Sequence, residues 1–180
     1  MRPHEFLETD LIRKNFPNRN RVTKQLSALR KHDESIFPAG RKGSAVHVTA
    51  TEAASLILLL STNPNPFNQS EFQSTINTIE ILKNFLNDLS LIFNCGGTHL
   101  NGQEVDTVFI SLDNPFGRIN FTGHLFNEYG LVKKNQAVER FAIITRDTMQ
   151  EISDLINNTP RQGSTEERKD FIENITNTKL

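Results

Sequence analysis

The chain has 180 residues, of which 36% are apolar and 23% charged, a composition typical of one globular domain or two small ones. The single cysteine, Cys95, excludes an intramolecular disulfide and any zinc site built from several cysteines. The longest apolar run, around residues 56–60, is far shorter than the roughly 18 residues of a membrane span, and the N-terminus lacks a secretory signal, so we expect a cytoplasmic protein with no membrane partner.

The charges are distributed unevenly along the chain. Residues 1–47 contain ten Lys or Arg and five Asp or Glu, a balance of +5, and residues 48–180 have a balance of -6. A basic first quarter attached to an acidic remainder suggests a module that faces a polyanion.

A break in the pattern falls at residues 61–68, where two prolines and three asparagines interrupt any helix. We therefore divide the chain into a first module, residues 1–62, and a second module, residues 67–180.

The first module shows apolar spacing typical of helices over residues 5–16 and 19–31, with Pro17 between them. Residues 32–47 contain glycines and no apolar period, which indicates a loop. Thr49 and Glu52 then form the pattern of a capping box, which predicts the start of an apolar helix in the centre of the core.

The sequence of the second module predicts helices around an antiparallel sheet. A capping signal at Ser70 opens a helix that extends to about Leu89. Strands are expected over residues 105–112, 118–122 and 137–145, with a hairpin loop at 113–117, followed by a helix capped near Thr145 and a last helix from Ser164. The fold class expected from this order is α+β, with a small antiparallel sheet and flanking helices.

The helix predicted over residues 19–31 has a polar outer face. If Val22 points inward, a rotation of about 100° per residue turns the side chains of Asn20, Lys24, Ser27 and Lys31 outward. No acidic residue lies on this helix, and Arg19 and Arg21 add to its positive charge. Such a face has donors for phosphates and base edges, although a solvated basic face is the alternative.

The loop after this helix places Arg41 and Lys42 between Gly40 and Gly43, a composition suited to a backbone that approaches phosphate closely. An ordinary surface loop is the alternative. A nucleotide-binding loop is excluded because Lys42 precedes the glycine instead of following it.

Together these features resemble the winged helix-turn-helix of MerR-type regulators and of small prophage-encoded regulators, over about residues 5–62. The resemblance implies that the helix 19–31 enters the major groove of double-stranded DNA and that the loop is a wing on the DNA backbone. The DNA-binding residues expected are Arg19, Asn20, Arg21, Lys24, Ser27, Lys31, Arg41 and Lys42.

Residues for catalysis are few. Cys95, His99 and Asp106 could form a catalytic triad. Cys95 and His99 could also bind a metal, but two ligands do not make a zinc site. No cofactor or metal is expected. The second module is rich in phenylalanine, and we expect Phe116, at the hairpin tip, and Phe126 to be exposed and to mark an interface.

The sequence therefore predicts a non-enzymatic transcriptional regulator that binds DNA as a homodimer, with residues 67–180 supplying the dimer contact. The alternative is a non-enzymatic adaptor that binds transcription machinery or another regulator, in which the helix-turn-helix-like module is a docking scaffold; a protein partner can also bind through residues 67–180. A small enzyme that uses Cys95 is a third, weaker hypothesis.

Overall fold

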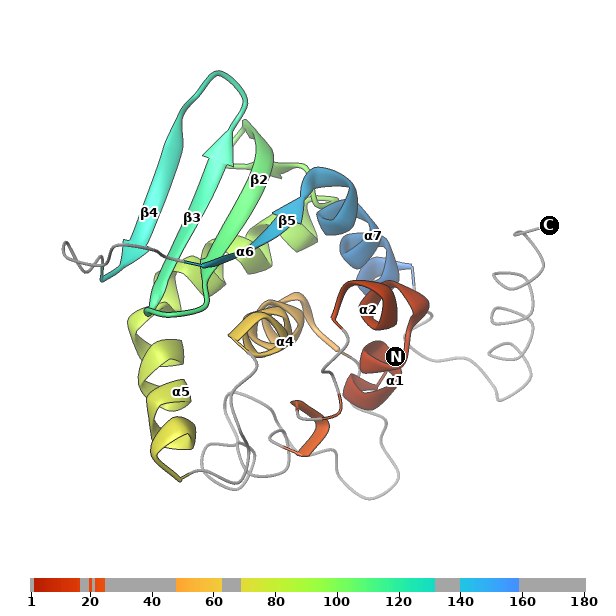
Figure 1. Ribbon diagram of the computed structural model, residues 1–180. Helices are drawn as coiled ribbons and strands as arrows, with labels where there is room; N and C mark the ends of the chain where they lie inside the picture. Colours follow the sequence, from red (N-terminus) through yellow and green to blue (C-terminus); the bar gives the residue numbers. More distant parts are fainter. Residues whose placement is uncertain are drawn as a thin grey trace, which may run out of the picture.

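An antiparallel sheet lies against helices in the computed structural model, which describes residues 2–16, 20, 22–24, 48–62, 69–131 and 140–158 (Figure 1). This confirms the α+β class. The helices that it labels are α1 (Pro3–Leu7), α2 (Asp10–Asn15), α4 (Ala50–Thr62), α5 (Gln69–Ile81), α6 (Lys83–Asn94) and α7 (Arg146–Asn157). The strands are β1 (His99–Leu100), β2 (Gln103–Ser111), β3 (Phe116–Phe121), β4 (Phe126–Gly130) and β5 (Phe141–Thr145).

The main sheet has the order β5–β2–β3–β4, and β1 pairs with the start of β2. Each pairing is antiparallel, and Val108 in β2 stands opposite Ile144 in β5 and Ile119 in β3. These three side chains are buried in the core. Since side chains alternate between the faces of a sheet, Phe109 and Ile143 belong to the opposite face, which we call the outer face.

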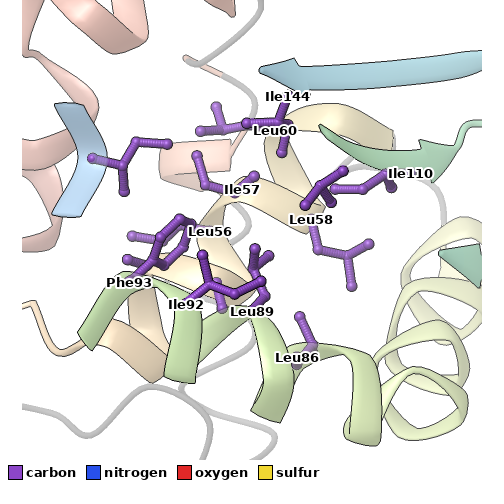
Figure 2. Close-up of a cluster of buried hydrophobic side chains, with 14 of the residues drawn as sticks. Leu56, Ile57, Leu58, Leu60, Leu86, Leu89, Ile92, Phe93, Ile110 and Ile144 are labelled. Atoms are coloured by element: carbon purple, nitrogen blue, oxygen red, sulfur yellow. The ribbon is translucent and has the colours of Figure 1, made fainter. Parts of the chain in front are cut away.

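Helix α4 is the centre of the core, as the sequence predicted, and every residue from Glu52 to Leu60 is buried. It packs against α6, α7 and β2. Figure 2 shows Leu56, Ile57, Leu58 and Leu60 of α4 among side chains of α6 and the sheet. The capping box is confirmed: the Thr49 amide donates to Glu52 Oε2 at 2.8 Å, and the Glu52 amide donates to Thr49 Oγ1 at 3.2 Å.

Two helices predicted as continuous are divided in the structure. The helix expected over 5–16 is two short helices, because Thr9 ends α1 and caps α2 with its hydroxyl, which accepts from the Ile12 amide at 3.5 Å. The helix expected from Ser70 to Leu89 is bent at Leu82, and α6 extends beyond it to Asn94. Leu82 is buried beside the end of β4, and the bend permits this contact.

The strand predictions are correct in position for β2, β3 and β5, but β1 and β4 were missed. Strand β4 is mostly exposed on both faces, so it lacks the apolar alternation that identifies a strand in a sequence. Strand β1 has two residues, too few to give a pattern. The loop between β2 and β3 runs over residues 112–115, one or two residues earlier than expected. The helix expected from Ser164 lies outside the described residues.

The buried core includes residues on both sides of segment 63–68. Helix α4, from the predicted first module, packs against α6 of the second, and Thr51 Oγ1 lies 3.1 Å from Ser90 Oγ. Whether residues 1–62 and 67–180 fold as separate domains stays a prediction.

Candidate nucleic-acid interface and partner surface

The predicted recognition helix is described at Asn20 and at residues 22–24, where the backbone is helical. The side chain of Val22 is 1% exposed and belongs to the core, whereas Asn20 and Lys24 are exposed. Residues 20 and 24 both lie about 200° from residue 22 around a helix and about 40° from each other. The structure therefore brings Asn20 and Lys24 together on the face opposite the core, as predicted.

The other predicted DNA-binding residues lie outside the described residues, and so does the predicted wing. They are Arg19, Arg21, Ser27, Lys31, Arg41 and Lys42. The winged helix-turn-helix is accordingly not confirmed, and the roles of these six residues stay predictions.

The segment before the predicted recognition helix is anchored in the core by its apolar side chains. Phe6, Leu7 and Ile12 are buried, and α2 packs against α7. On the exposed side of this segment, the Arg13 guanidinium forms an ion pair with the Glu8 carboxylate at 2.5 Å. The positive charge of Arg13 is therefore neutralised by a residue of the same segment. Val22, further along the chain, is likewise buried in the core.

A second candidate surface is the outer face of the sheet, where aromatic side chains gather. The rings of Phe109 and Phe141 meet edge to face with centroids 6.1 Å apart, and the rings of Phe116 and Phe141 are 6.3 Å apart. We call Phe109, Phe116, Phe141 and the neighbouring Ile143 the outer cluster. Edge-to-face pairs of this kind add stability beyond the area that they bury.

The two phenylalanines expected to be exposed differ in the structure. Phe126 is 53% exposed, as predicted, and the Arg118 guanidinium lies over its ring at 4.2 Å while pairing with Glu128 at 3.1 Å. The expectation for Phe116 is wrong, because it is only 6% exposed. It is the first residue of β3 instead of a loop-tip residue, and its ring is partly covered by Phe141.

Sequence reasoning missed Phe141 and Ile143 as surface residues. Both were assigned to a strand, and alternation within Phe-Ala-Ile-Ile-Thr placed them on the same face. The sequence gives no signal that this strand pairs with β2 alone among the described strands, because strand order depends on contacts between distant segments.

The residues considered for catalysis do not assemble into a triad. Cys95 is exposed in the turn after α6, the His99 ring bonds to Thr98 Oγ1 at 2.9 Å, and Asp106 lies 4.0 Å from Arg146. Among the described residues, no hydrogen bond joins Cys95 to His99, and no group of three or more His, Cys, Asp or Glu is placed to hold a metal ion.

A cleft of about 460 Å³ lies between the ends of α2 and α4 and strand β5. Its lining combines apolar groups such as Phe16 and Ile144 with Ser61, whose hydroxyl oxygen is buried and has no hydrogen-bond partner among the described residues. It carries Arg140 at its rim, but this guanidinium already bonds to Asp113 at 2.6 Å. These groups supply few directed contacts for a small ligand.

Comparisons of the chain with family models, with curated proteins and with solved structures found no match. The resemblance to MerR-type regulators therefore stays a prediction from the sequence. None of the helices in the described ranges is long and apolar enough to cross a membrane.

Proposed function

We propose that the chain is a cytoplasmic DNA-binding regulator of transcription that acts through its basic first quarter without chemistry. The observation that carries the proposal is the orientation of the predicted recognition helix, with Val22 in the core and Asn20 and Lys24 exposed on the opposite side. A helix held in this way presents an amide and an ammonium group outward. These groups suit contacts to base edges and phosphates in a major groove.

The electrostatic part of the proposal rests on charge. The balance of +5 in residues 1–47 suits the neutralisation of phosphates and the release of counterions, whereas the remainder of the chain is acidic. Arg41 and Lys42 act in this proposal as sequence-independent backbone contacts, and Lys24 and Ser27 read the groove.

The test is DNA binding by the full chain, first by selecting sites from random double-stranded DNA and then by measuring the affinity for the selected site. Lys24→Ala together with Ser27→Ala should weaken the selected site by about 1–3 kcal/mol per lost contact and change random DNA less. Lys83→Ala is the matched control, because Lys83 is exposed and its substitution removes one positive charge from the other module. Failure to select any site, or equal losses in both variants, would contradict the proposal.

The wing is tested by salt dependence. Arg41→Ala with Lys42→Ala should weaken selected and random DNA by similar factors and flatten the slope of log affinity against log salt by about one to two units. An unchanged slope would make this loop an ordinary surface connection.

Phe141 and Ile143, the exposed members of the outer cluster, favour a second candidate function, an adaptor that binds another protein through the sheet. Apolar side chains that remain exposed on a folded surface are typical of protein interfaces. Adaptor binding would depend weakly on salt, whereas DNA binding should fall steeply as salt rises. If the full chain binds no DNA but still binds a protein partner at high salt, the result would support the adaptor function.

A further inference from the structure

We draw no further inference here: the strongest candidate, the apolar patch that Phe141 and Ile143 form on the outer face of the sheet, carries nothing, because nothing in the described part of the structure shows what covers it.

Discussion

Gly117 in β3 lies directly against the ring of Phe85 in α6, so that a Cβ atom on the glycine would be 2.8 Å from the ring carbons. Phe85 is fully buried, and its ring also packs against Tyr129 with centroids 5.5 Å apart. The glycine therefore sets how closely the sheet approaches α6. The requirement is for space, because Gly117 is not among the residues with positive φ.

Gly117→Ala should lower the free energy of unfolding by about 1–3 kcal/mol, because the added methyl group must displace a packed ring. Urea unfolding measures this change. Phe85→Leu in the same chain should recover part of the loss, since the smaller side chain makes room for the methyl group, and the double-mutant cycle would show this coupling. Full stability of Gly117→Ala would mean that the sheet moves freely away from α6.

Tyr129 offers a probe of the second contact between the sheet and α6, because it is the single tyrosine of the chain. Its hydroxyl donates to Asp88 Oδ2 at 2.5 Å. Burial raises the pKa of Tyr129 above its ordinary range, and the hydrogen bond to Asp88 adds to this effect. An absorbance titration of the folded chain should show the phenol ionising well above pH about 10.

Asp88→Asn should lower the pKa of Tyr129 only partly, because burial remains. A raised pKa in the folded state means that the stabilisation is present below the ordinary pKa and is lost as pH rises through the folded one. The natural chain should therefore lose stability above pH about 10 more steeply than Tyr129→Phe, which has no group to ionise. Parallel pH profiles of the two chains would contradict this.

The sequence predicted the parts of the fold that depend on local pattern. The capping box at Thr49 and the N-cap at Thr145 are correct because their hydrogen bonds join residues three apart. The central position of α4 followed from its largely apolar sequence. The bend at Leu82 could not be predicted, since it serves a contact with Gly130, 48 positions further along the chain.

The candidate surfaces show the same limit. The orientation of Val22 and Lys24 followed from helical periodicity alone. The exposure of Ile143 and the burial of Phe116 depend on which strand lies at the edge of the sheet and on which ring covers which. Neither can be deduced from spacing, because both result from contacts between β2, β3 and β5.

The ion pair between Asp113 and Arg140 holds the start of β5 against the loop after β2. Arg140 donates both from its side chain, at 2.6 Å, and from its amide, at 2.9 Å, to the Asp113 carboxylate. These hydrogen bonds lower the pKa of Asp113 below its ordinary value. The stabilisation is therefore present above the ordinary pKa and is lost as pH falls through the lowered one.

Asp113→Asn should lower the melting temperature at neutral pH and make it fall less steeply below pH about 4 than in the natural chain. The measurement is thermal unfolding across the acid range. Asp106→Asn is the control, because this exposed carboxylate lies 4.0 Å from Arg146 and should change the profile less. Identical acid profiles for the natural chain and Asp113→Asn would show that the pair adds nothing to stability.

The capping box at the start of α4 combines a side chain that is exposed with one that is buried. Thr49 is exposed, whereas Glu52 is buried and one of its oxygens, Oε1, has no hydrogen-bond partner in the described part of the chain. Thr49→Ala removes the acceptor for the Glu52 amide and should lower the free energy of unfolding by about 1 kcal/mol. Thr49→Ser keeps the hydroxyl and should retain most of the stability, as measured by urea unfolding. Equal losses in the two variants would assign the effect to the threonine methyl group instead of the cap.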